Sequence, residues 1–539
     1  MARTSLMRLL RRAYQIAELS AQTPIPLLEV SDEWQLSRRQ VLQGLSTVGL
    51  MGISGGIPRS MARSMLPPQI AASVSRQTVG SASDSPVLIV GAGVAGLTTA
   101  YRLRQAGVPV AIVEASQRVG GRLVSVINAA GETGTVELGG EFIDSRHTAV
   151  RSLAAELGLE LADLRQADAG LEREILYFQG QRISETKVIE EFAPLAHQIN
   201  RDLQPLRTRD ITYHQPSPEA QRLDRLSLAA YLAEAPVSPM IDQLVRVAYI
   251  TEFGRDAEEQ SCLNMLFLIG AEVGKWSTYG VSDERYHVIG GNDQIPKRLA
   301  AQLADAIEFG TVLESLRVTD DQRYRVSLRR ESTSLERTYD RIVVTVPFTV
   351  LRQVELAVEL PPIKRLAIDT LGYGTCSKLA VPYRERIWRT RYGCTISIYT
   401  DQDFQNTWES ARYAPGPGGW VTDLRGGKQG LQLGLNTPEF HAADLTRQLD
   451  AIFPGINQVS QGQALRSVWA SEPYALGSYS CYLPGQWTTI GGSEAERVGN
   501  LWFAGEHCSL GSQGYMNGAC ESGEAVAQEI LADLGVQSA

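Results

Sequence analysis

Apolar and polar positions after residue 85 alternate in the way typical of an α/β fold. A continuous apolar run over 87–90 predicts a buried strand, and a glycine-rich turn over 91–96 leads into a helical pattern. A second apolar run over 108–113 predicts another strand, which ends on Glu114. A strand, a helix and a second strand in this order predict a βαβ unit with two parallel strands.

The turn in this unit has the Gly-x-Gly-x-x-Gly spacing of dinucleotide-binding proteins, at Gly91, Gly93 and Gly96. The first glycine permits a tight turn, the second lets the backbone approach a pyrophosphate, and the third lets helix and strand pack closely. Glu114 follows the first glycine by 23 residues and is placed to accept hydrogen bonds from ribose hydroxyls. The unit therefore predicts a bound dinucleotide, and the acid argues against a 2′-phosphate because it would repel one.

Further along the chain the pattern changes several times. Helical patterns are predicted over 147–167, 188–206, 222–272 and 516–533, and strands over 306–318, 324–331, 341–346, 378–383 and 501–506. The sequence thus predicts an α/β protein, α+β overall, with a Rossmann-type nucleotide-binding domain assembled from segments 85–147, 286–346 and 466–535. The intervening segments, 148–285 and 347–465, are predicted to form an inserted substrate domain of mixed sheet plus helices.

The charge of the chain is unevenly distributed. The 539 residues carry a net charge of −9, which gives no electrostatic basis for binding nucleic acid. Residues 1–83 hold nine arginines and only four acids, so the leader is basic and the rest is acidic. The pair Arg38-Arg39 precedes a weakly apolar, glycine-rich run to Ile57, a layout that resembles a twin-arginine export signal.

We therefore expect residues 1–84 to be an export leader and linker that directs the protein to the periplasm or outside the cell. The alternative is a disordered tail with chance arginines. The run before Ile57 and the C-terminal segment 530–536 are both too short to anchor the chain in a bilayer, so no transmembrane anchor is expected. Six cysteines without a Cys-x-x-Cys pair, and six scattered histidines, predict neither a disulfide framework nor a metal site.

Four separated motifs make residues 85–534 resemble the flavin-dependent amine oxidase family, which includes monoamine, polyamine and L-amino-acid oxidases. They are the βαβ unit with its extension Arg118-Val119-Gly120-Gly121-Arg122, the turn Glu137-Leu138-Gly139-Gly140, the segment Gly374-Thr375-Cys376-Ser377-Lys378, and Phe503-Ala504-Gly505-Glu506 followed by Gly514-Tyr515-Met516. The resemblance implies FAD as cofactor. It assigns cofactor contacts to Gly91, Gly93, Val94, Ala95, Gly96, Glu114, Ala115, Arg122, Gly139, Gly140, Val312, Gly505, Glu506 and Met516.

The same resemblance implies a catalytic group. Lys378 matches the family lysine that holds a water at flavin N5, and the alternative is an ordinary strand lysine. Tyr479 and Tyr515 match the two aromatic residues that wall the amine site in monoamine oxidases, and the alternative is a core position for each. His507 is a candidate base, although a structural loop histidine is the competing interpretation.

One departure from the family concerns the attachment of the cofactor. Some members bind FAD covalently through a cysteine just before the first of the two aromatic residues. Here Ser478 stands at that position and Cys481 follows three residues later. We therefore expect non-covalent FAD.

The resemblance implies oxidative deamination by hydride transfer to flavin, with O₂ as acceptor and H₂O₂ as product. An L-amino-acid oxidase is expected, because an exported enzyme without an anchor resembles a scavenging enzyme. Glu141 stands where amino-acid oxidases often place an arginine for the substrate carboxylate, and the nearest arginine is Arg146. Glu141 is therefore a candidate substrate-binding residue that would favour a basic amino acid, or else a structurally paired carboxylate.

Other functions stay open at this point. A monoamine or polyamine oxidase is the main alternative, followed by a carotenoid-type desaturase and a non-catalytic FAD-binding module. The expected partners are a small amine or amino acid and O₂. The sequence does not decide the oligomeric state, and a homodimer is among the states it allows.

Overall fold

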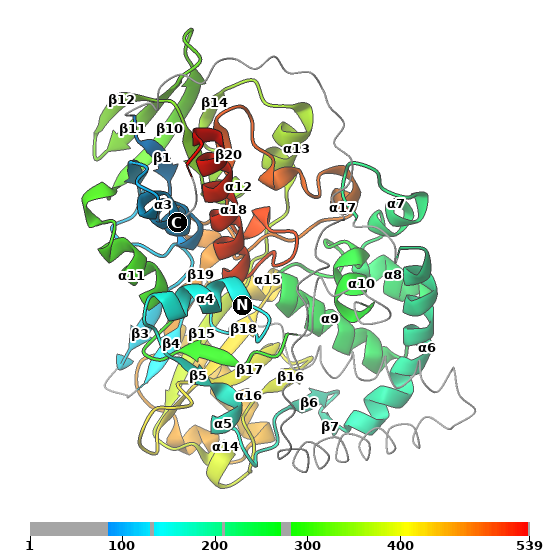
Figure 1. The fold of residues 1–539 in the computed structure, drawn as a ribbon. Helices are drawn as coiled ribbons and strands as arrows, with labels where there is room; N and C mark the ends of the chain where they lie inside the picture. Colours follow the sequence, from blue (N-terminus) through cyan, green and yellow to red (C-terminus); the bar gives the residue numbers. More distant parts are fainter. Residues whose placement is uncertain (1–84, 130–133, 207–210, 271–281, 537–539) are drawn as a thin grey trace, which may run out of the picture.

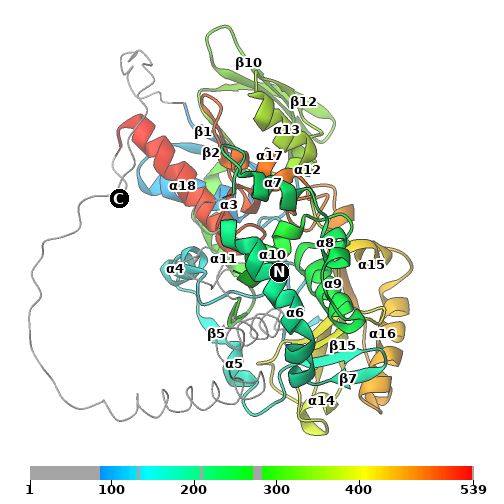
Figure 2. The same cartoon turned by 90° about the vertical axis from the view of Figure 1, so that its right-hand side faces the viewer.

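The computed structural model describes residues 85–129, 134–206, 211–270 and 282–536, which Figure 1 draws as a coloured ribbon. The leader predicted over residues 1–84 lies outside the described residues. In both views the hairpin of β10, β11 and β12 lies at one end of the molecule, and the short helix α14 lies at the opposite end (Figures 1 and 2).

A five-stranded sheet forms the nucleotide-binding part, and all its neighbouring strands run parallel. The strand order is β20 (Leu501–Phe503), β13 (Ile342–Val344), β1 (Val87–Val90), β2 (Val110–Val113) and β9 (Ile307–Glu308). These strands come from three separated parts of the chain, so the predicted Rossmann-type domain built from three segments is confirmed. Their side chains are mostly apolar and buried, as expected for a parallel sheet covered on both faces.

Four helices pack against one face of this sheet: α3 (Val94–Gln105), α4 (Thr148–Glu156), α11 (Gln294–Ala301) and α18 (Met516–Leu534). The other face belongs to a second buried cluster, which contains side chains of the next sheet and of two short helices. The first and last of the four, α3 and α18, lie side by side in both views although the chain separates them by some 400 residues. Apolar side chains of β1, β2, α3 and α18 share one buried cluster, which fixes the C-terminal helix against the first βαβ unit.

Two further sheets extend the molecule. The first has the order β12 (Thr333–Tyr339), β11 (Tyr324–Arg330), β10 (Thr311–Val318) and β14 (Glu355–Ala357). The second has seven strands in the order β19 (Leu465–Val468), β15 (Ser377–Tyr383), β18 (Gly419–Arg425), β17 (Asn406–Ser410), β16 (Ile398–Thr400), β6 (Ile175–Phe178) and β7 (Gln181–Ile183). Two small antiparallel pairs join β3 (Ser125–Ile127) to β4 (Thr135–Glu137), and β5 (Leu161–Asp163) to β8 (Tyr286–Val288).

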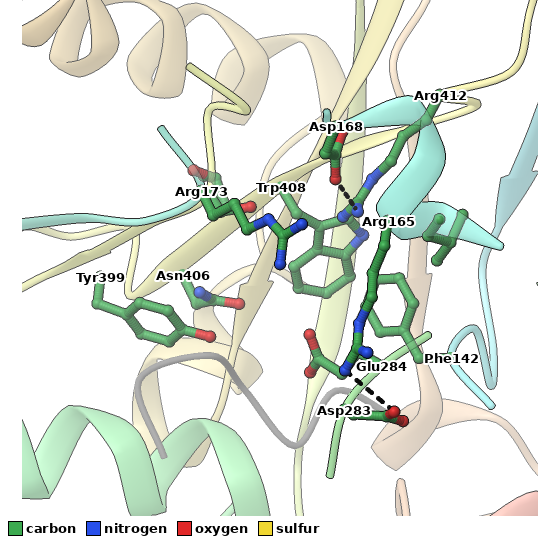
Figure 3. Close-up of a pocket in the computed structure, with 13 residues that line it drawn as sticks. Phe142, Arg165, Asp168, Arg173, Asp283, Glu284, Tyr399, Asn406, Trp408 and Arg412 are labelled. Carbon is green, nitrogen blue, oxygen red and sulfur yellow. Dashed lines mark hydrogen bonds and ion pairs between the residues drawn. The ribbon is translucent and has the colours of Figure 1, made fainter. Parts of the chain in front are cut away.

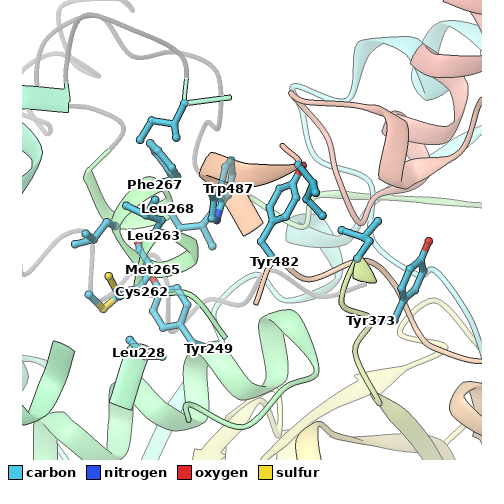
Figure 4. Close-up of a cluster of buried hydrophobic side chains, with 14 of the residues drawn as sticks. Leu228, Tyr249, Cys262, Leu263, Met265, Phe267, Leu268, Tyr373, Tyr482 and Trp487 are labelled. Carbon is cyan, nitrogen blue, oxygen red and sulfur yellow. The ribbon is translucent and has the colours of Figure 1, made fainter. Parts of the chain in front are cut away.

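A group of helices packs beside the seven-stranded sheet. It consists of α6 (Glu185–Leu203), α7 (Pro218–Asp224), α8 (Leu228–Glu234), α9 (Pro239–Phe253) and α10 (Cys262–Gly270). The remaining helices are α5 (Leu164–Ala167), α12 (Phe348–Leu351), α13 (Pro362–Thr370), α14 (Ile387–Thr390), α15 (Gly427–Gln432), α16 (Pro438–Ile452) and α17 (Gln486–Thr489). Figure 4 shows how apolar side chains of α8, α9 and α10 meet Tyr482 and Trp487 in one buried cluster.

Some local predictions were wrong in detail. The region 222–272 is not continuous, because Ser227 and Ser238 each cap the N-terminus of a new helix through their side chains. The region 147–167 holds α4, β5 and α5 rather than one helix, and β12 was not predicted at all. No helix in the described ranges is long and apolar enough to cross a membrane.

The first turn of the βαβ unit generates a prediction about stability. A Cβ atom at Gly96 would lie 2.1 Å from the Gly91 carbonyl oxygen, whereas one at Gly93 would meet no protein atom within 4 Å. Gly96→Ala should therefore lower the free energy of unfolding by about 3 kcal/mol or more, because backbone must move. Gly93→Ala should leave the melting temperature of the cofactor-free protein nearly unchanged. Equal melting temperatures for the two variants would contradict this prediction.

Candidate flavin and amine site

A long cavity of about 350 Å³ runs along the carboxyl ends of the parallel strands. This is the edge where α/β proteins of this type bind their ligands. The predicted cofactor residues that line it are Gly91, Gly93, Val94, Ala95, Glu114, Ala115, Arg122, Gly140, Val312, Gly505, Glu506 and Met516. The two other predicted residues lie beside it: Gly96 packs under the turn, and Gly139 lines a second, smaller cavity.

The glycine turn leaves room for a phosphate group. Gly91 has a φ of 109°, which favours glycine, and the position of a Cβ at Gly93 is open. Gly93 caps α3 without any side-chain hydrogen bond, so the first N–H groups of this helix face the cavity. Helix N-termini of this kind bind anions. The turn therefore fits the pyrophosphate of a dinucleotide.

Glu114 lines the same cavity but is already held by the protein. Its carboxylate accepts hydrogen bonds from the Ala92 N–H at 2.8 Å, and from the Ser116 N–H at 2.8 Å and hydroxyl at 2.7 Å. A carboxylate has about four acceptor positions, so one remains for a ribose hydroxyl. The acid is thus fixed at the end of β2, where the sequence predicted it.

The wall of the cavity also contains an ion pair between Arg122 and Glu506, with an N–O distance of 3.0 Å. Glu506 also accepts hydrogen bonds from Ser480 and from the Gly514 N–H. Burial by itself raises the pKa of Glu506, but Arg122 and these hydrogen bonds hold it below its usual value. The pair connects the Gly-Gly-Arg extension to the loop before α18, whose N-terminal residue Met516 lines the cavity.

A smaller cavity of about 30 Å³ adjoins the long one, and Arg122, Gly140 and Trp469 line both. Lys378 and Tyr479 line it. The structure thus brings the predicted catalytic lysine and one predicted aromatic residue to the end of the dinucleotide cavity. Lys378 comes from β15 and Leu424 from β18, so the seven-stranded sheet forms part of the wall of the small cavity.

Lys378 is buried, and its ammonium is held by a single turn of the chain. It donates to the Glu137 carbonyl oxygen at 3.1 Å, to the Gly139 carbonyl oxygen at 2.9 Å and to Glu141 Oε2 at 2.7 Å. An ammonium has three N–H donors, so these three acceptors use all of them. None is left for the water that the family resemblance assigns to this lysine.

Glu141 completes this arrangement. Its second oxygen, Oε1, accepts from the Trp408 indole N–H at 2.9 Å, and the Lys378 ammonium lies 5.1 Å from the centre of the Trp408 ring. Burial alone raises the pKa of the Glu141 carboxyl, but Lys378 and the indole hydrogen bond hold it below its usual value. The geometry corresponds to the paired carboxylate that the sequence left as the alternative to a substrate-binding role.

The two predicted aromatic residues meet near a second acid. The Tyr479 hydroxyl donates to the Thr251 carbonyl oxygen at 3.1 Å, and the Tyr515 hydroxyl lies 3.4 Å from Glu252 Oε1. Tyr479 is buried beside Gly514, the residue before Tyr515. Burial, with smaller contributions from its neighbours, raises the pKa of Tyr479, so its phenol is neutral. Sequence reasoning missed Glu252, because an acid near the end of an apolar helical pattern gives no signal of its own.

His507 lies away from these groups. It is buried, its two ring nitrogens have no hydrogen-bond partner among the described residues, and its ring packs 4.5 Å from that of Phe348. Burial lowers the pKa of His507 to about 4, so the ring is neutral near pH 7. It lines neither cavity, which agrees with a structural loop histidine better than with a base.

An outer pocket lies on the other side of Trp408 (Figure 3). Three arginines enter it: Arg165 pairs with Asp283 and Arg412 with Asp168, whereas Arg173 extends its guanidinium toward the indole. The remaining lining includes Glu284, Tyr399 and the buried amide of Asn406. Phe142, Leu164 and Trp408 line this pocket and belong to the same buried cluster as Tyr479, which lines the small cavity.

The fold is shared with solved amine oxidases. Cyclohexylamine oxidase from Brevibacterium oxydans IH-35A superposes with a TM-score of 0.72 at 22% identity, over 84% of this chain and 100% of that chain. Putrescine oxidase bound to putrescine superposes with a TM-score of 0.69 at 19% identity, over 83% of this chain and 99% of that chain. At these identities the likeness establishes the fold.

The chain is also similar in sequence to curated amine oxidases. The flavin-containing amine oxidase of Oncorhynchus mykiss is 24% identical over 472 residues, covering 83% of this chain and 86% of that protein. The flavin-containing amine oxidase B of Sus scrofa is 26% identical over 471 residues, covering 84% and 87%. The model of the flavin-containing amine oxidoreductase family matches residues 94–531, and the chain therefore belongs to this family.

Proposed function

We propose that this protein is an FAD-dependent amine oxidase that converts a primary amine to an imine, with O₂ as acceptor and H₂O₂ as product. The observation that carries the proposal is that the two cavities adjoin. Arg122, Gly140 and Trp469 line the long cavity, and the same three residues line the small one together with buried Lys378 and Tyr479. Family membership establishes a flavin cofactor, and the cavity along the glycine turn favours its dinucleotide form.

We propose that FAD binds without a covalent bond. Ser478 lies at the position of the family's attachment cysteine, and its hydroxyl accepts the Cys376 N–H at 3.2 Å. Two thiols lie nearby, but burial raises the pKa of Cys376 and that of Cys481 to about 12 in each case. A thiol with so high a pKa is a poor nucleophile near pH 7. When bound, the flavin accepts a hydride from the substrate and passes electrons to O₂.

The amine chamber is assigned to the region of Tyr479, Tyr515 and Glu252. A lysine-like amine has a pKa of about 10.4, so neutralising it near pH 7.4 costs about 4 kcal/mol. Desolvation between aromatic walls lowers an amine pKa by about 3–5 units, enough to supply the neutral amine without a protein base. The two tyrosines thus orient and desolvate the reacting nitrogen.

The substrate class follows from the charges around this chamber. Arg122 is paired with Glu506, and Arg146, the candidate for gripping a substrate carboxylate, is exposed. The acid Glu252 favours a positive group in the substrate instead. The curated relatives named above are amine oxidases as well, so we propose the monoamine or polyamine alternative over L-amino-acid oxidation. An L-amino acid is the second candidate, because Arg173 in the outer pocket offers a guanidinium to a carboxylate.

We also propose that the protein is exported through the twin-arginine route. The pair Arg38-Arg39 before a short, glycine-rich apolar run supports this proposal. That route carries folded proteins, which suits a chain that must acquire its dinucleotide before it leaves the cytoplasm.

The substrate class is tested by an amine panel read as H₂O₂. Putrescine, spermidine, benzylamine, L-lysine, L-arginine and L-phenylalanine are compared at equal concentration. We expect the amines without a carboxylate to give the highest kcat/KM.

Glu252→Gln should lower kcat/KM for putrescine about tenfold more than for benzylamine, because only the diamine has a second positive charge that the Glu252 carboxylate can bind. Highest turnover on the L-amino acids would refute the amine assignment, and no peroxide with any substrate would refute the oxidase.

Lys378→Met should slow the reoxidation of the flavin by O₂ while the cofactor stays bound, because the variant removes a buried positive charge at the end of the cavity. Stopped-flow mixing of the reduced protein with O₂ measures this step separately from reduction by the amine. We expect a loss of about tenfold or more. Unchanged O₂ kinetics in the loaded variant would remove the lysine from the oxidative step.

Acid precipitation tests the mode of cofactor binding. FAD should appear in the supernatant and the pellet should be colourless, because Ser478 offers no thiol. Gly93→Ala should release FAD on dilution at a higher protein concentration than the parent, since the new methyl group occupies space at the helix N-terminus and weakens binding. Yellow colour that stays with the precipitated protein would contradict non-covalent binding.

A further inference from the structure

The Lys378–Glu141 pair lies between two cavities that have no lining residue in common. Lys378 lines the small cavity at the end of the dinucleotide site, together with Gly139 and Tyr479. Glu141 instead lines a cavity of about 420 Å³ on the opposite side. The mouth of that cavity contains Ile127, which is 54% exposed, so it opens toward solvent. The ammonium thus faces the cofactor end, and its counter-charge faces a region that small solutes can enter.

The ammonium cannot turn away from this position without losing a partner. Its three N–H groups are all taken by the turn of residues 137–141, two by carbonyl oxygens and one by the carboxylate. The carboxylate is itself fixed by the Trp408 indole N–H. Lys378 and Glu141 are both buried, at 4% and 5% exposure, and a buried charge that loses its partner is strongly destabilised.

We propose that Glu141 is a positioning residue that fixes the Lys378 ammonium as a permanent buried charge beside the flavin, and that this charge, rather than a lysine-held water, supports the reaction of the reduced cofactor with O₂. The inference rests on the proposed oxidase function. It assigns to Glu141 a role that acts through Lys378, without direct contact to the substrate.

The charged and titratable groups around Lys378 come from several elements. They are Glu137 at the end of β4, Glu141 in the turn after it, His287 on β8 beside Glu137, Arg122 in the shared cavity wall, Cys376 before β15, and Tyr479. The Glu137 carboxylate already forms hydrogen bonds with His287, the Ser125 hydroxyl and the Asn292 N–H. Arg122 forms its ion pair with Glu506. Glu141 is therefore the carboxylate that the structure commits to Lys378.

The first test compares Glu141→Gln with Glu409→Gln. Glu409 is a matched control, because it too is a buried acid. It accepts a hydrogen bond from the Trp388 indole N–H and forms ion pairs with Arg386 and Arg389, and it makes no contact with Lys378. In Glu141→Gln the ammonium loses its counter-charge, so the rate of reoxidation by O₂ should fall with rising pH between 6 and 9, by about tenfold per pH unit beyond the midpoint.

The parent and Glu409→Gln should show flat profiles over the same range. The midpoint potential of the bound flavin supplies a readout that does not depend on turnover. At pH 6 the uncompensated ammonium in Glu141→Gln should shift this potential upward, and the double variant Glu141→Gln/Lys378→Met should reverse the shift. A profile and a potential that match those of Glu409→Gln would overturn the proposal.

The second test uses the open cavity behind Glu141. Glu141→Ala should be slow in reoxidation, and added formate should restore its rate, because this small carboxylate can enter the cavity and face Lys378. Formate should not restore Lys378→Met, and chloride at the same ionic strength should not restore Glu141→Ala. If a lysine-held water were the active group, Glu141→Ala would free one N–H and react as fast as the parent without formate, which would overturn the proposal.

Failure to fold has its own control. If Glu141→Gln does not accumulate as folded protein, Glu141→Asp replaces it, because that variant keeps the carboxylate. Glu141→Asp must keep the flat pH profile of the parent, and a sloping profile would count against the proposal.

The inference and the proposed function fail in different ways. Protein without flavin or without peroxide would refute the oxidase, whereas active, flavin-loaded protein with an indifferent Glu141 would refute only the positioning role.

Discussion

The structure depends on a buried ammonium enclosed by one turn of the chain. Lys378 belongs to the seven-stranded sheet, and its three partners belong to residues 137–141, at the end of β4 in the small β3–β4 pair. The same segment accepts two more hydrogen bonds at the Leu138 carbonyl oxygen, from Ser467 and from Trp469. Because a buried charge without partners is costly, these bonds hold residues 137–141 against the seven-stranded sheet, where Gly139 and Lys378 line the small cavity.

A second ion pair fixes the other side of this space. Arg122 and Glu506 lie almost 400 residues apart in sequence, yet they bring the extension of the first βαβ unit against the loop before α18. Ser480 and Gly514 bind the same carboxylate, so both segments that carry the predicted tyrosines are held by it. Buried charges that are paired within the protein thus fix the segments around the site. Glycines and aromatic rings form much of the remaining cavity wall.

The interior places its acids unequally. Glu141 is paired with Lys378, whereas Glu252 Oε1 lies 3.4 Å from the Tyr515 hydroxyl. Residue type alone made Glu141 the candidate for binding a positively charged substrate. We propose Glu252 for that role instead, because the carboxylate of Glu141 is already bound to Lys378.

The glycine turn, α3 and the acid after β2 follow from residues close together in sequence, so local sterics and apolar periodicity were enough to predict them. The family motifs likewise indicated which residues would gather at the cavity, since each lies in a short segment of characteristic composition. The division of 222–272 into separate helices was missed because serine caps compete with a continuous apolar pattern. Only the tertiary structure decided the partners of Lys378, the place of Trp408 between two pockets, and the approach of Glu252 to Tyr515. Those contacts join residues up to 267 positions apart, and the free energy of a buried charge depends on which groups surround it in space rather than on its neighbours in the chain.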